Sequence, residues 1–115
     1  MGIWHNSKLM ADQFAANGYF CLVIDLYNGD ALALNKPAGF EFEAWMREGS
    51  GGNNPHTTEA IDPIVEAAVK AMRKVYGIKR LGVVGYCFGA KVSPPVMSRP
   101  DGAKTVSLLM ASTCL

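Results

Sequence analysis

Residues 19–24 form an uninterrupted apolar run, Tyr-Phe-Cys-Leu-Val-Ile, that ends at Asp25. A strand with one face in water alternates polar and apolar residues, whereas a strand covered by helices on both faces is apolar throughout. Residues 81–84 (Leu-Gly-Val-Val) form a second, shorter run, and residues 106–110 are apolar enough for one more strand. These runs predict buried strands of the kind found in a parallel sheet.

Helical periodicity is present before and between the first two runs. Residues 8–17 have one apolar face, and residues 59–76 repeat apolar side chains at helical spacing. The expected N-caps and stops are Ser7 and Gly18 for the first helix, and Thr57 or Thr58 and Gly77 for the second. Because helices alternate with strands, we expect the α/β class, with a mainly parallel sheet flanked by helices.

The segment between the first strand and the long helix is expected to be mostly loop. Residues 40–47 fit a short helix, with Trp45 as local packing, and the glycine-rich residues 48–55 fit a flexible surface loop. His56 follows Pro55 in this loop, and we expect it to be solvated. Neither side of the loop is long enough to fold alone, so residues 1–115 are predicted to form a single domain.

The charge and the cysteines limit the expected partners. The formal net charge is +1, so no global field would recruit nucleic acid or an anionic membrane, and no apolar run is long enough to span a bilayer. The three cysteines, Cys21, Cys87 and Cys114, form no Cys-x-x-Cys pair and lack zinc-ligand spacing. We therefore expect no metal, no disulfide framework and a reducing compartment, most simply the cytoplasm.

Residues 85–89 (Gly-Tyr-Cys-Phe-Gly) match the nucleophile-elbow pattern, with cysteine in place of serine. The chain must reverse sharply between strand and helix, and larger side chains at Gly85 and Gly89 would collide. The turn would lift the Cys87 sulfur to a helix N-terminus, where backbone N–H groups favour a thiolate. The N–H of Phe88 would then face the oxyanion formed when a carbonyl is attacked. The alternative from the turn alone is an inert, buried cysteine.

Longer segments resemble fungal members of the dienelactone hydrolase family, which belongs to the α/β-hydrolase superfamily. The likeness covers about residues 2–91 and is carried by residues 11–19 (ADQFAANGY), 25–30 (DLYNGD), 34–37 (LNKP), 62–65 (DPIV) and 85–91 (GYCFGAK). The resemblance implies a carboxylic ester or lactone hydrolase in which Cys87 is the nucleophile of a Cys-Asp-His triad. It also implies a small-molecule substrate and no metal or organic cofactor.

The sequence departs from this family in its triad. The acid and the histidine should follow the nucleophile, yet both histidines, His5 and His56, precede Cys87. Asp101 is the only carboxylate side chain after the elbow, and its neighbours Pro100 and Gly102 indicate a plain turn. An unorthodox pairing of His5 with Cys87 is the weaker alternative to a surface histidine at a helix entrance.

Both ends of the chain depart from the family as well. A family strand expected before Gly2 is missing, and residues 92–115 diverge, because Val-Ser-Pro-Pro at 92–95 would break the helix after the elbow. We therefore expect an incomplete, partial α/β-hydrolase fold. The leading hypothesis is a hydrolase by descent whose 115 residues alone have little or no turnover. The alternative is a catalytically inactive fragment or a ligand-binding pseudo-enzyme, and the oligomeric state is left open.

Four other side chains have more than one possible role or a purely structural one. Asp25 ends a strand, where it would either contact substrate or cap the following turn. Lys91 would either raise the potential near the thiol or be solvated. Cys21 is expected to pack within its strand, and Cys114 to be exposed near the terminus.

Overall fold

The structure is a computed structural model that describes residues 1–89 and 107–111, the latter by their backbone alone. Three candidate residues, Lys91, Asp101 and Cys114, lie outside the described residues. The same is true of the helix break expected at residues 92–95.

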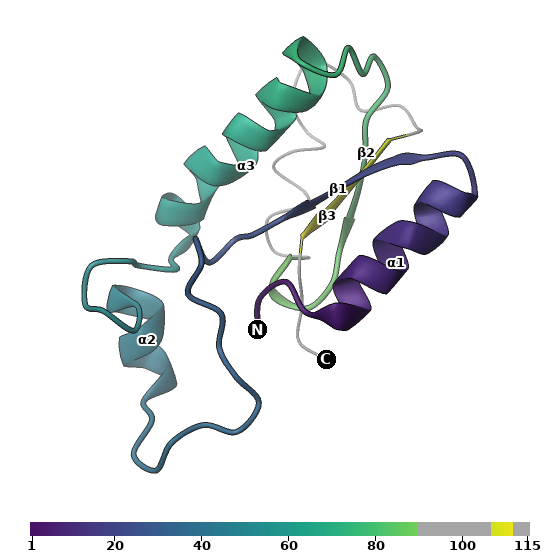
Figure 1. Cartoon of the computed structure of the whole chain (residues 1–115). Coiled ribbons are helices and arrows are strands. Elements are labelled where there is room, and N and C mark those ends of the chain that lie inside the picture. Colours follow the sequence, from purple (N-terminus) through teal and green to yellow (C-terminus); the bar gives the residue numbers. More distant parts are fainter. Residues whose placement is uncertain (90–106, 112–115) are drawn as a thin grey trace.

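The described strands form one three-stranded sheet. They are β1 (Phe20–Ile24), β2 (Gly82–Gly85) and β3 (Ser107–Ala111), in the order β1-β3-β2 (Figure 1). Both pairings are parallel, which confirms the predicted sheet type. Ile24 and Gly85 both pair with Ala111, so β1 and β2 end at the same level. The residues that follow these two strands therefore emerge at the same end of the sheet, on either side of β3.

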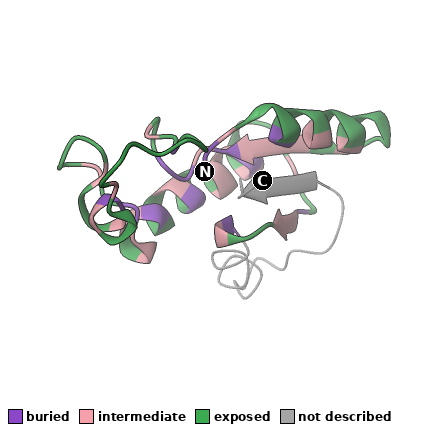
Figure 2. Cartoon of the chain, turned by 90° about the horizontal axis from the view of Figure 1, so that it is seen from below, coloured by how far each residue is buried: buried purple, intermediate pink, exposed green. Residues whose placement is uncertain are grey.

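Two helices cover the sheet. α1 (His5–Ala16) and α3 (Thr58–Lys74) lie on opposite sides of it, as the views in Figures 1 and 2 together show. The predicted helix–strand alternation is thus confirmed. α3 ends as predicted near Gly77, which has φ +65°, and the Ile78 N–H donates to the Met72 carbonyl over a distance of 2.9 Å.

The predicted start of α1 was wrong. Ser7 does not cap this helix, because the helix already begins at His5 and has Trp4 in the N-cap position. The Trp4 carbonyl accepts hydrogen bonds from the N–H groups of Ser7 and Lys8, at 3.0 and 3.3 Å. Ser7 therefore lies in the first turn, where only 3% of it is exposed. A small residue suits this buried position, whereas the capping pattern alone suggested a boundary.

The main core lies beyond the carboxyl end of β1. There the chain after the strand packs against α3 and the short helix α2 (Phe42–Glu48), which begins and ends within two residues of its prediction. Figure 2 shows the buried residues gathered in this part of the molecule. The buried members are Ile24, Leu26, Tyr27, Leu32, Trp45, Ile61 and Val65. Tyr27 and Ile61 are fully buried, so this cluster is a rigid support for the neighbouring end of the sheet.

Candidate active site

The chain turns sharply directly after β2. Cys87 has φ +54°, a left-handed conformation that costs a residue with a Cβ about 1–2 kcal/mol. The Gly89 N–H donates to the Tyr86 carbonyl at 3.0 Å and closes the turn. Phe88 and Gly89 begin a helical turn whose continuation lies outside the described residues. The predicted reversal between strand and helix is therefore present, with its strain located at Cys87.

The Cys87 side chain is accessible at this turn. The residue is exposed, so the burial expected under the alternative of an inert cysteine is not found. Cys21, in contrast, is half-buried, and burial raises the pKa of its thiol, with a smaller contribution from the nearby Asp12 carboxylate. Of the two cysteines that the structure describes, Cys87 is the more exposed.

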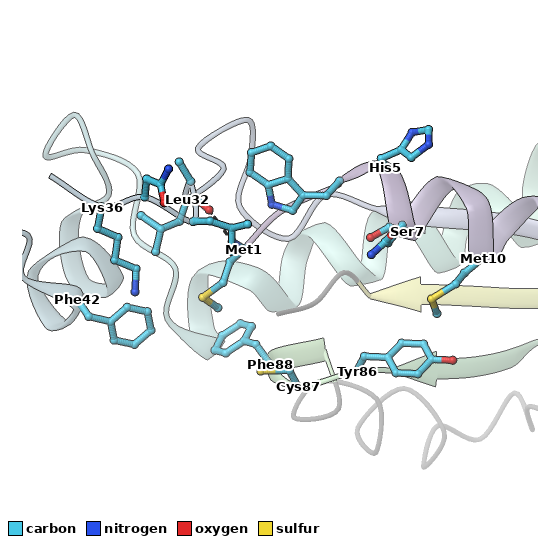
Figure 3. A pocket seen from close by; sticks show the side chains of 15 residues that line it. Met1, His5, Ser7, Met10, Leu32, Lys36, Phe42, Tyr86, Cys87 and Phe88 are labelled. Atoms are coloured by element: carbon cyan, nitrogen blue, oxygen red, sulfur yellow. Dashed lines mark hydrogen bonds between the residues drawn. The ribbon is translucent and has the colours of Figure 1, made fainter. Parts of the chain in front are cut away.

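Cys87 opens onto a large apolar cavity of about 1030 Å³. Its described walls come from the start of α1, from residues 32–36 and from the elbow, as Figure 3 shows. Met1 and Leu32 close one side, where the Leu32 N–H donates to the Met1 carbonyl at 2.8 Å. No sequence pattern indicated this wall, because it depends on two segments 31 residues apart. A cavity of this size accommodates a small organic molecule beside the thiol.

Polar groups are few in the described walls of this cavity. Lys36 carries its ammonium group 5.4 Å from the ring centre of Phe40 and 5.7 Å from that of Phe42. His5 also lines the cavity, but its exposed ring points away from Cys87 in Figure 3. This placement favours the interpretation of His5 as a surface histidine over a pairing with the thiol.

Asp25 holds the turn after β1. Its two carboxylate oxygens accept hydrogen bonds from the N–H groups of Tyr27, at 3.0 Å, and Gly29, at 2.8 Å. Asn28, between them, has φ +51° and is stabilised in this conformation by the turn. Of the two roles considered for Asp25, the structure shows the capping of the turn.

The expectation that His56 is solvated was wrong. Only 1% of its surface is exposed, and its Nε2 lies 2.9 Å from Oδ2 of Asp30. The ring stacks near Trp45, with centroids 4.3 Å apart, and contacts the edge of Tyr27. The glycine-rich composition of residues 48–55 suggested exposure, but the loop folds back so that His56 enters the core. The same contacts confirm Trp45 as a packing residue, 3% exposed.

Phe88 links the elbow to this core. Its ring packs against the core cluster, and its centroid lies 5.9 Å from that of Tyr27. The backbone of Tyr27 is itself held, since its carbonyl accepts a hydrogen bond from Asn54 Nδ2 at 3.1 Å. The residue after Cys87 therefore rests on a fixed aromatic surface. Sequence patterns did not indicate this contact, which joins residues 61 positions apart.

The described part of the chain lacks two kinds of feature. No group of three or more His, Cys, Asp or Glu side chains in residues 1–89 could hold a metal ion. No described helix is both long enough and apolar enough to cross a membrane.

Known proteins similar to this chain are hydrolases by name. "Hydrolase tropI" of Talaromyces stipitatus is 48% identical over 90 residues, which cover 75% of this chain and 34% of that protein. "Hydrolase pyvD" of Aspergillus violaceofuscus is 43% identical over a gapped alignment of 116 positions, which covers 88% of this chain and 44% of that protein. "Dienlactone hydrolase 1" of Gibberella moniliformis is 34% identical over 100 residues, which cover 79% of this chain and 35% of that protein.

The chain spans less than half the length of these relatives. No solved structure matches it significantly. Residues 1–108 match the dienelactone hydrolase family, a range that includes all described helices and the complete elbow. Together with the parallel sheet and the strained cysteine turn, this match shows that the chain belongs to the dienelactone hydrolase family, which has the α/β-hydrolase fold.

Proposed function

We propose that this chain provides the nucleophile of a carboxylic ester or lactone hydrolase, and that Cys87 is that nucleophile. The single observation that carries the proposal is an exposed cysteine with φ +54° just after a half-buried parallel strand. Backbone strain of this kind persists where the surrounding structure enforces it, and it clusters at functional sites. The family match and the apolar cavity beside the sulfur support the same assignment.

The proposed reaction begins with the thiolate of Cys87. The sulfur attacks the carbonyl carbon of the ester, an S–C bond forms, and the C=O electron pair moves to the oxygen. The Phe88 N–H is proposed to donate to this oxyanion. The carbonyl then re-forms, the C–O bond breaks and the alkoxide leaves, taking a proton from water. Hydrolysis of the resulting thioester by a second water returns the thiol, and no metal or organic cofactor takes part.

The described geometry supports acylation better than turnover. The ring of the buried His56 donates to Asp30, and His5 points away from Cys87, so neither is placed to activate water beside the thioester. We therefore propose that these 115 residues are acylated by an activated ester and deacylate slowly. Loss of a triad member costs several orders of magnitude in rate, which gives the expected scale. A reducing cytoplasm would keep the Cys87 thiol reduced.

The test is the reaction of the chain with p-nitrophenyl acetate. Release of one equivalent of p-nitrophenolate, together with one acetyl group on the intact protein by mass spectrometry, is expected. Digestion with trypsin separates the cysteines, because residues 81–91 carry Cys87 alone. Cys87→Ala should abolish the burst, and Cys21→Ala should leave it unchanged. A burst of equal size in Cys87→Ala would refute the assignment.

A second candidate function is ligand binding without chemistry. The apolar cavity and the absence of a described histidine directed at Cys87 favour it. It predicts that an aromatic lactone binds with the same affinity to the wild type and to Cys87→Ala, with no covalent adduct. Isothermal calorimetry and the mass of the protein after incubation distinguish the two functions.

A further inference from the structure

We infer that His56 is a positioning residue for the elbow and that it acts through Tyr27 on Phe88. The inference rests on the proposed function, because it concerns the amide that is proposed to stabilise the oxyanion. His56 touches neither Cys87 nor the cavity beside it in the described structure. Its effect is carried by contacts that lead from Asp30 to the aromatic ring of Phe88.

His56 is held by two hydrogen bonds, one from its ring and one from its backbone. The Asp30 carboxylate only accepts hydrogen bonds, so Nε2 of His56 carries the hydrogen that it donates across 2.9 Å. The backbone N–H of His56 donates to the Met46 carbonyl at 2.8 Å. Asp30 is held in turn, since the same Oδ2 accepts the Ser50 N–H at 2.7 Å. With 1% of the residue exposed, no alternative ring position is open to solvent.

His56 in turn fixes the plane of Tyr27. The two rings meet edge to face, with centroids 5.3 Å apart and planes at 82°. This is a preferred aromatic geometry, and it allows little rotation of a fully buried ring. Trp45 packs against both rings, and its centroid lies 5.3 Å from that of Tyr27 and 4.3 Å from that of His56. The three rings therefore form one rigid group.

Phe88 is the member of the elbow that rests on this group. Its ring lies at 35° to Tyr27, with centroids 5.9 Å apart. The turn needs such support, because the left-handed conformation of Cys87 is unfavourable and relaxes if the packing around it loosens. A shift of Phe88 moves its backbone N–H as well. Loss of the His56–Asp30 contact should therefore displace the oxyanion donor while the sulfur remains accessible.

Two reactions of Cys87 separate a positioning role from a purely structural one. Acetylation by p-nitrophenyl acetate passes through an oxyanion, whereas alkylation by iodoacetamide is a displacement at carbon that forms none. A change in the thiolate fraction of Cys87 alters both rate constants by the same factor and leaves their ratio unchanged. The ratio of acetylation to alkylation therefore reports on the oxyanion donor. We expect His56→Leu to lower this ratio about tenfold, less than the loss of a complete oxyanion-hole donor. His56→Gln, whose amide nitrogen can donate to Asp30, should restore most of it.

The controls address folding. Asp30→Ala removes the carboxylate that accepts the hydrogen bond from His56. Because Asp30 lies near the surface, this variant should fold even if His56→Leu does not, and it should also lower the ratio. Met72→Ala removes a fully buried side chain outside the aromatic group. It should lower the melting temperature but leave the ratio within about twofold of the wild type. Circular dichroism confirms that each variant is folded before the rates are measured.

The outcomes separate this inference from the proposed function. Acetylation that does not depend on Cys87 refutes the proposed function. Acetylation at Cys87 with an unchanged ratio in folded His56→Leu and Asp30→Ala refutes the positioning role alone. An equal fall of the ratio in Met72→Ala also refutes it, because any loss of stability would then produce the effect.

Discussion

His56 donates a hydrogen bond to Asp30 across 26 residues of sequence, at an Nε2–Oδ2 distance of 2.9 Å. Asp30 ends the turn that follows β1, and His56 ends the loop that follows α2. The contact therefore holds the segment between β1 and α3 together as one compact unit. Because this unit packs under Phe88, it connects a distant segment of the chain to the candidate nucleophile.

The two described cysteines should differ in reactivity. Burial, and to a lesser extent Asp12, raises the pKa of the Cys21 thiol above its ordinary value, so little of it is thiolate near neutral pH. Cys87 is exposed. We expect iodoacetamide to modify Cys87 at least about tenfold faster than Cys21. Peptide mapping after limited labelling measures both sites, and equal labelling of the two would contradict this prediction.

The strain at Cys87 should be measurable as stability. Glycine adopts φ +54° without a steric penalty, whereas alanine retains the Cβ that causes it. We expect the free energy of unfolding of Cys87→Gly to be about 1 kcal/mol higher than that of Cys87→Ala, so that the glycine variant is the more stable. This is the reverse of the usual effect, in which glycine destabilises a folded protein. Urea unfolding of the two variants, neither of which contains the thiol, isolates the backbone effect. A less stable glycine variant would show that the turn is not strained.

The sequence predicted the elements that depend on local patterns. Both apolar runs became parallel strands, as the absence of polar–apolar alternation predicted, although their residues are mostly half-buried rather than buried. The cysteine turn was predicted from glycine spacing, since the sterics of a sharp reversal act within five residues. The reversal and the exposure of Cys87 follow that prediction. The roles of Cys87, Phe88, Gly85 and Gly89 in catalysis stay predictions.

Contacts between distant segments were not predictable in the same way. The placement of His56 depends on the path of residues 48–55, whose glycines allow many conformations and therefore give no directional signal. Ser7 resembled a cap because its side chain suits one, but the helix began earlier, at His5. The cavity beside Cys87 depends on Met1 and Leu32 meeting. Each of these features arises from packing, which single-sequence patterns do not encode.

Gly49 should be the least replaceable glycine of the loop after α2. It has φ +71°, and a Cβ built there would lie 2.3 Å from the carbonyl oxygen of Asn54. Gly49→Ala therefore forces the loop away from Asn54, whose side chain holds the Tyr27 carbonyl. We expect a loss of about 2–4 kcal/mol in unfolding free energy, from strain and clash together. Gly52→Ala is the matched control.

Gly52 has a similar backbone, with φ +76°, but open space where a Cβ would be placed. Its replacement by alanine should cost only the conformational penalty, about 1 kcal/mol. Urea unfolding of both variants gives the difference. Equal losses would mean that the loop moves freely at Gly49, which would also weaken the positioning role of His56.

The pH dependence of stability should contain a contribution from Asp30. Partial burial raises the pKa of this carboxyl group, but hydrogen bonds from Ser50 and from His56 outweigh that effect, and the pKa lies below its ordinary value of 3.8. Because the folded state binds this proton more weakly than the unfolded state, the group stabilises the fold above the ordinary pKa. This stabilisation is lost as the pH falls through the lower, folded-state pKa.

Asp30→Asn should therefore flatten the loss of stability in acid. Asparagine can accept a hydrogen bond but does not titrate, so this variant should be less stable than the wild type near neutral pH, and the difference should narrow below about pH 4. Asp62→Asn changes the same charge on an exposed residue of α3 and is the control. The measurement is the free energy of unfolding by urea at a series of pH values. A constant difference between Asp30→Asn and the wild type across the series would show that the carboxylate does not titrate with folding, and that the contact with His56 does not depend on its charge.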